Sequence, residues 1–178
     1  RGACSFCSAY QMWKGYRAKN GDAIARDIKR LANRHRILDF QLVDNTLPAS
    51  AGARSAMFEA IAKIKKDLLL VVSTRATLQQ KDIDVMYRAG VRCVYVGIEA
   101  IDDHILEIMK KGTTLYHNLK TVKLLRESRI YVASNVIFSH PGCKKEDVNR
   151  SAAIIDDICH LQPPSYSHFQ LLRRSDVY

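Results

Sequence analysis

The feature that most constrains the fold of this chain is a regular alternation of short apolar segments with longer amphipathic ones. The apolar segments predict strands at residues 39–43, 68–73, 91–98, 130–138 and 168–172. Apolar residues at helical spacing predict helices at 21–35, 54–66, 78–89, 103–110, 116–127 and 146–161. Because strands joined by helices run parallel, we expect an α/β domain with a parallel sheet and outer helices, either a full or partial barrel or an open doubly wound sheet.

Polar residues follow the predicted strands, where parallel α/β folds bind their ligands. These positions are Asp44, Asn45, Ser73, Arg75, Gly97, Glu99 and the loop after Phe138. No G-x-G-x-x-G or P-loop sequence opens a helix, which argues against a dinucleotide or nucleoside triphosphate site. The strand ends are therefore the expected position of the functional site.

The composition is that of one globular domain, with 178 residues, 47% hydrophobic and 26% charged. No apolar run approaches the roughly 18 residues of a membrane span, so no membrane partner is expected. The net charge of +10 would suit an anionic partner such as RNA. The simpler interpretation is that the basic clusters are solvated helix faces, at Arg26–Arg36, Lys63–Lys66, Lys110–Lys111, Lys144–Lys145 and Arg173–Arg174.

Five cysteines give an odd number, which is typical of a reducing, cytoplasmic location rather than a disulfide framework. Cys93 and Cys159 lie in apolar patterns and are expected in the core. Cys4 and Cys7 alone have the spacing of metal or redox ligands. A redox pair, half of a zinc site, part of an iron–sulfur site with one more upstream thiolate, and an inert structural turn all stay open from the residues alone.

The chain resembles the radical S-adenosylmethionine (SAM) superfamily in several motifs that occur in the family's order. Residues 1–7 resemble its C-x3-C-x2-C motif without the first cysteine, and Phe6 supplies the aromatic residue before the last. Further matches are Val43-Asp44-Asn45, residues 89–99, residues 106–113 and the turn 138–142. Departures are Ser139 and His140 in place of Gly and Phe, Cys143 in place of Glu, and Ser73 in place of an acidic residue.

The resemblance implies a partial (β/α)6 barrel over residues 1–178, the radical SAM core domain, with the first strand and the first cluster cysteine upstream. The chain begins without Met, which fits a piece of a longer protein. The resemblance further implies a [4Fe–4S] cluster on Cys4 and Cys7, and SAM cleaved to a 5′-deoxyadenosyl radical. It assigns SAM or substrate contacts to Phe6, Asp44, Asn45, Glu99 and Asn135, and it identifies no catalytic residue.

Purely structural roles for these residues stay open. Asp44 and Asn45 could cap a turn, Glu99 could form an ion pair, and Asn135 could be a satisfied buried amide. Within the superfamily, the chain resembles maturation enzymes of ribosomal peptides, which are cobalamin-dependent C-methyltransferases. That resemblance implies a peptide substrate, a reductant such as a flavodoxin or ferredoxin, and cobalamin on a domain outside these residues. The alternatives are an enzyme like the tRNA methylthiotransferases, with RNA as partner, and a non-catalytic metal-binding βα module.

Overall fold

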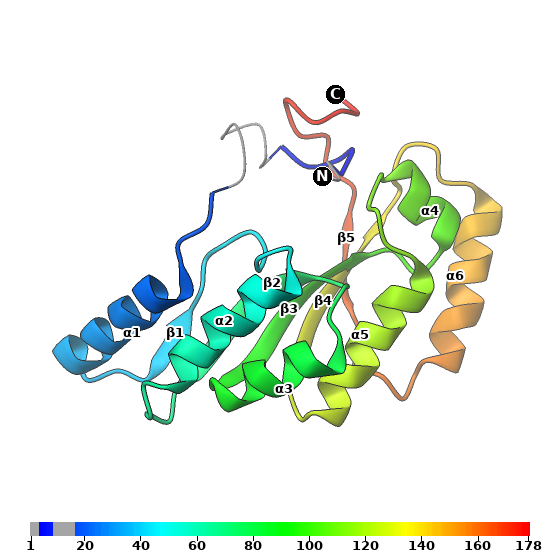
Figure 1. Ribbon diagram of the computed structural model, residues 1–178. Coiled ribbons are helices and arrows are strands. Elements are labelled where there is room, and N and C mark those ends of the chain that lie inside the picture. Colours follow the sequence, from blue (N-terminus) through cyan, green and yellow to red (C-terminus); the bar gives the residue numbers. More distant parts are fainter. Residues whose placement is uncertain (1–3, 9–16) are drawn as a thin grey trace.

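A curled sheet of parallel strands with helices on its convex side forms the protein (Figure 1). The computed structural model describes residues 4–8 and 17–178. The sheet order follows the chain, with β1 (Asp39–Gln41), β2 (Leu69–Arg75), β3 (Val91–Glu99), β4 (Tyr131–Phe138) and β5 (Ser165–His168). All neighbouring strands are parallel. The predicted α/β fold, a partial barrel with outer helices, is confirmed.

Six helices pack along the sheet in the described part of the chain. They are α1 (Gly21–His35), α2 (Ala51–Ala62), α3 (Gln80–Arg88), α4 (Asp103–Ile108), α5 (Leu115–Glu127) and α6 (Lys145–Asp157). The side chains of Asn20, Ser50 and Thr114 each accept a hydrogen bond from a backbone N–H in the first turn of α1, α2 and α5. These caps satisfy donors that a helix leaves unpaired at its start. None of the helices within 4–8 and 17–178 has both the length and the apolar character needed to cross a membrane.

The last strand differs from the prediction, because β5 covers 165–168 rather than 168–172. The apolar residues that suggested the later position lie beyond the strand, and Phe169 continues the pairing with a single bond from its N–H to the Phe138 carbonyl (2.7 Å). The observed strand is instead polar, since Ser165 and Ser167 hydrogen-bond Asn135 on β4. Its register is thus set by side-chain hydrogen bonds that an apolar pattern does not reveal.

The period of two along the strands divides each of them between a packed face and an open face. Leu70 and Val72 on β2 and Val94 on β3 are fully buried. They pack in the main core with buried helical residues such as Phe58. Burying such a side chain stabilises the fold by about 2 kcal/mol. The alternate residues point to the concave side, so the core lies under the helices and leaves the inner face of the half-barrel for other groups.

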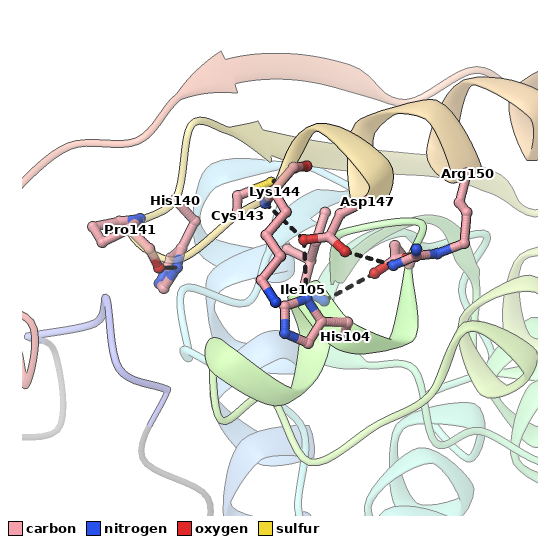
Figure 2. A network of polar contacts seen from close by, with 9 residues as sticks. His104, Ile105, His140, Pro141, Cys143, Lys144, Asp147 and Arg150 are labelled. Atoms are coloured by element: carbon pink, nitrogen blue, oxygen red, sulfur yellow. Dashed lines mark hydrogen bonds and ion pairs between the residues drawn. The ribbon is translucent and has the colours of Figure 1, made fainter.

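A polar network joins α4 to α6 (Figure 2). Asp147 accepts from the Lys144 amide (2.8 Å) and from Arg150 (2.5 Å), and its carboxylate lies 2.9 Å from His104 Nδ1. Asp102, the cap of α4, accepts from Arg150 Nε (2.8 Å). Ligand atoms of Asp102, His104 and Asp147 lie within 4.8 Å of one another, but Arg150 already donates to both carboxylates. The network is therefore a structural connection between two helix starts rather than a cation site.

Candidate functional site

A cavity of about 810 Å³ opens at the C-terminal ends of the strands, under the cysteine turn. The turn lies beside the C-terminal tail on this edge of the sheet (Figure 1). Six of the residues predicted for the site line this cavity: Cys4, Phe6, Cys7, Asn45, Glu99 and Asn135. Parallel strands bring their C-terminal ends to one edge, so residues far apart in the chain meet there.

The cysteine turn presents two half-buried thiols to the cavity. The Cys7 amide donates to the Cys4 carbonyl at 3.1 Å, which closes the turn and places both side chains on one short loop. Burial raises the pKa of the Cys4 thiol, whereas the nearby charges of Lys111 and Arg75 lower it. Burial outweighs the two cations, so the pKa of the Cys4 thiol lies above its ordinary value, and the cations offset part of the cost of forming the thiolate that binds soft metals.

An ion pair stands on the cavity wall near the turn, with Lys111 Nζ 6.0 Å from the centroid of the Phe6 ring. Lys111 is 6% exposed, and its Nζ donates to Glu99 Oε1 at 2.9 Å. Arg75 donates to the Lys111 carbonyl. The solvated surface predicted for the Lys110–Lys111 cluster is therefore wrong for Lys111, because the chain turns inward after α4. Lys110 is exposed, as predicted.

Glu99 occupies a left-handed backbone conformation with φ of 61°, which is unfavourable for a residue with a side chain. The Asn118 side-chain amide holds this position, since it donates to the carbonyls of Ile98 (3.0 Å) and Ala100 (3.2 Å) on either side. Within the described residues, no donor reaches Glu99 Oε2. Strain maintained by a buried amide is typical of a functional position.

Gly97 gives the ion pair its space. A Cβ atom at this position would lie 2.9 Å from Lys111 Nζ and 3.1 Å from Glu99 Oε1. Both distances are shorter than ordinary contacts, so a side chain at residue 97 would displace the pair. The glycine at this strand position is therefore explained by its neighbours in the cavity.

Asn135 lies on the β4 wall of the cavity with both ends of its amide satisfied. Its Nδ2 donates to Ser167 Oγ at 2.9 Å, and its Oδ1 accepts from Ser165 Oγ at 3.2 Å. The alternative role considered for Asn135, an amide whose hydrogen bonds are satisfied, is thus correct for the bonds within the protein. The same bonds fix the orientation of a polar group that borders the cavity.

Asp44 is the one predicted site residue that lies apart from the others. It is exposed and borders a separate cavity of about 320 Å³ between α1 and the segment after β1. Asn45 faces the large cavity together with Thr46. The structure therefore does not bring Asp44 and Asn45 to one position, and a role for Asp44 stays a prediction.

Sequence reasoning missed several groups in the cavity wall. Lys111 was hidden in a basic cluster, and Arg75 had no assigned role. Tyr95, Ser165 and Ser167 also line the wall, together with Ser73, which was expected at this strand end. The period of two along β3 could have identified Tyr95. Cys93 and Cys159, which lie outside the cavity, were both expected in the core. Cys93 is only half-buried, and the expectation is wrong for Cys159, which is exposed because α6 ends at Asp157.

Comparisons with known proteins show which family and which relatives this chain is similar to. The family model described as the radical SAM superfamily matches residues 1–155. The anaerobic magnesium-protoporphyrin IX monomethyl ester cyclase of Cereibacter sphaeroides is 29% identical over 154 residues, which covers 83% of this chain and 25% of the cyclase. The hopanoid C-3 methylase of Methylococcus capsulatus is 28% identical, covering 75% of this chain and 26% of the methylase.

A solved structure shows the same fold. The radical S-adenosylmethionine methyltransferase TsrM from Kitasatospora setae, with tryptophan substrate and a SAM analog bound, superposes with a TM-score of 0.77 at 22% identity. The match covers 92% of this chain and 33% of TsrM. The chain thus spans about a quarter of the length of the cyclase and the methylase.

Proposed function

Because the chain belongs to the radical SAM superfamily, we propose that it forms the catalytic core of an enzyme that binds a [4Fe–4S] cluster and SAM. The observation that carries this proposal is the position of the cysteine turn. Its two thiols border an 810 Å³ cavity whose wall also holds Glu99, Lys111 and Asn135. A metal centre and an organic cofactor with charged and polar groups would meet in such a space.

The described donors fit part of an iron–sulfur site. Cys4 and Cys7 would hold two irons, and a third thiolate would come from the cysteine that the motif places upstream. Arg75 and Lys111 offset part of the effect of burial, which raises the pKa of the Cys4 thiol. With cluster and SAM bound, the site would supply a carbon-centred radical that takes a hydrogen atom from the substrate.

The protein groups around the cavity would bind and orient SAM. Glu99 Oε2 would accept from the ammonium group or the ribose hydroxyls, while Lys111 holds Oε1. Asn45 and Asn135 offer amides to the remaining polar groups of SAM or to substrate. The backbone at Phe6 would lie along the adenine edge. Fixed donors and acceptors of this kind orient a cofactor while the cofactor supplies the chemistry.

The finer reaction is C-methylation of a ribosomal peptide, with a reductant protein as electron source and cobalamin on another domain. The methylase and the methyltransferase among the similar proteins support methyl transfer. The peptide as substrate rests on the sequence resemblance alone.

The test is reconstitution of the whole chain that the gene encodes with iron and sulfide under anaerobic conditions. A brown protein that forms 5′-deoxyadenosine from SAM after reduction is the expected result. Cys4→Ala and Cys7→Ala should remove both properties, whereas Cys159→Ala, an exposed cysteine, should keep them. A colourless protein loaded with zinc would overturn the proposal. Transfer of a labelled methyl group from SAM to a synthetic peptide would then test the finer reaction.

A further inference from the structure

Ser5 is the buried centre of the cysteine turn, with 2% exposure between neighbours that are half-buried. Its N–H donates to the Met109 carbonyl (2.9 Å), and its carbonyl accepts from the Val177 N–H (3.2 Å). Its hydroxyl lies 3.2 Å from both the Ile108 carbonyl and His140 Nε2. The turn is thus anchored through one residue to the end of α4, the C-terminal tail and the loop after β4.

His140 is the buried side-chain partner of that anchor, with 3% exposure. Figure 2 shows its ring beside Pro141, and Nδ1 lies 2.8 Å from the Pro141 carbonyl. The ring also makes edge contacts with Phe6 (centroids 6.5 Å apart) and Phe169 (5.1 Å). Two aromatic contacts and two polar contacts leave this imidazole little freedom.

The partners of the ring define its hydrogen-bond direction. Burial lowers the pKa of His140, which favours the neutral imidazole. A carbonyl can only accept, so Nδ1 carries the proton toward Pro141 and Nε2 is left as an acceptor. The one proton of the Ser5 hydroxyl then has two acceptors, the Ile108 carbonyl and Nε2, each 3.2 Å from Oγ. His140 and the end of α4 therefore fix the Ser5 side chain together.

We propose that His140 is a positioning residue that acts through Ser5 to hold Cys4 and Cys7 in the conformation that receives a metal cluster. This inference rests on the proposed function, because it assumes a cluster on the turn. Hydrogen-bond partners behind metal ligands orient those ligands, and their loss typically costs about 10- to 100-fold in metal affinity or activity. Ser5 lies between Cys4 and Cys7 in the chain, so a shift of this residue moves both.

Three substitutions separate the contacts of His140. His140→Phe keeps the ring and loses both hydrogen bonds, His140→Gln can place an acceptor near the Nε2 position, and His140→Asn can reach only the Nδ1 position. Ser5→Ala removes the other partner, and His160→Phe is a control on an exposed histidine. Each variant of the whole chain is loaded with iron and sulfide and then mixed with a chelator of ferrous iron. The rate of iron loss and the electron paramagnetic resonance spectrum of the reduced cluster are recorded.

We expect His140→Phe and Ser5→Ala to lose iron about 10-fold faster than wild type and to change the spectrum in the same way. The double variant should lose iron no faster than either single variant, His140→Gln should recover most of the wild-type rate, and His140→Asn should not. If His140→Phe fails to fold, the difference in the rate of iron loss between His140→Gln and His140→Asn tests the inference instead. A wild-type chain that takes up no cluster would overturn the proposed function, and the inference with it. A wild-type cluster that His140→Phe and His140→Asn hold equally well, with an unchanged spectrum, would overturn the inference alone.

Discussion

The Arg54–Asp82 and Lys111–Glu99 ion pairs have similar chemistry and very different surroundings. Arg54 donates to both carboxylate oxygens of Asp82, at 3.2 and 2.9 Å, and to the backbone carbonyls of residues 48 and 49. Asp82 also accepts from the Gln79 amide at 3.0 Å. This pair is enclosed between α2 and α3, and protein groups meet both oxygens of its carboxylate.

The Lys111–Glu99 pair has one hydrogen bond, and it borders the cavity. Its carboxylate keeps an oxygen without a donor in the described residues, on a backbone with positive φ. A fully satisfied pair holds two helices together, whereas an incompletely satisfied pair leaves capacity for a ligand. The oxygen without a donor thus makes the Lys111–Glu99 pair, and not the Arg54–Asp82 pair, a candidate for ligand binding.

The largest effect is expected when the enclosed pair is broken. Arg54→Met should lower the free energy of unfolding by about 3–5 kcal/mol, because it leaves the Asp82 carboxylate buried without its cation. Urea denaturation followed by circular dichroism measures this change. The double variant Arg54→Met/Asp82→Asn should recover part of the loss, and Arg30→Met should be nearly neutral, since Arg30 forms only an exposed pair at 3.5 Å. If Arg54→Met were as stable as wild type, the enclosed ion pair would contribute nothing to the free energy of unfolding.

A smaller change in stability and a larger change in binding are expected at the cavity pair. Glu99→Gln should change the free energy of unfolding by roughly 1 kcal/mol, because the amide can still accept from Lys111. Affinity for SAM should fall roughly tenfold or more, since a hydrogen bond to a charged group is worth about 1.5–3 kcal/mol. Calorimetric titration of the reconstituted chain with SAM measures this affinity. Glu107→Gln, at an exposed position of α4, is the control. Unchanged affinity would remove Glu99 from the binding site.

The smallest effect is expected at Asp147, a buried carboxylate whose partners Arg150 and His104 are partly exposed. Hydrogen bonds from the Lys144 amide, His104 and Arg150 lower the pKa of Asp147 to about 2. The charged carboxylate therefore stabilises the fold above its ordinary pKa of about 3.9, and this contribution is lost as the pH falls toward 2. The difference in stability between wild type and Asp147→Asn should shrink over that range in acid titrations. Asp156→Asn, an exposed carboxylate on the same helix, should show no such trend.

Much of the fold could be predicted because its signals are local. Helical spacing and apolar strands predicted α1 and β3 closely, and the parallel connection followed from their alternation. β5 was misplaced because serine hydroxyls that pair with Asn135 determine its position. Such a bond joins residues about thirty positions apart, and a pattern in one segment cannot contain it.

The candidate site was predictable where it depended on strand ends and not where it depended on the path of a loop. Asn45, Glu99 and Asn135 meet in one cavity because parallel strands end at one edge. Asp44 and Asn45 were expected together, but they lie beyond β1, where the chain bends at Asn45, and they border different cavities. The burial of Lys111 and the contact of Ser5 with His140 depend on tertiary packing, so no local sequence signal marks them.

The division of each strand into a packed face and an open face has a consequence for how such a domain can change over generations. Val72 and Val94 cannot be altered without disturbing the core, whereas Ser73 and Tyr95, each the next residue along the strand, border only the cavity. Substitutions at the second set change what the cavity accepts at little cost to folding. One scaffold can thus acquire new substrates by small steps and remain folded at each of them.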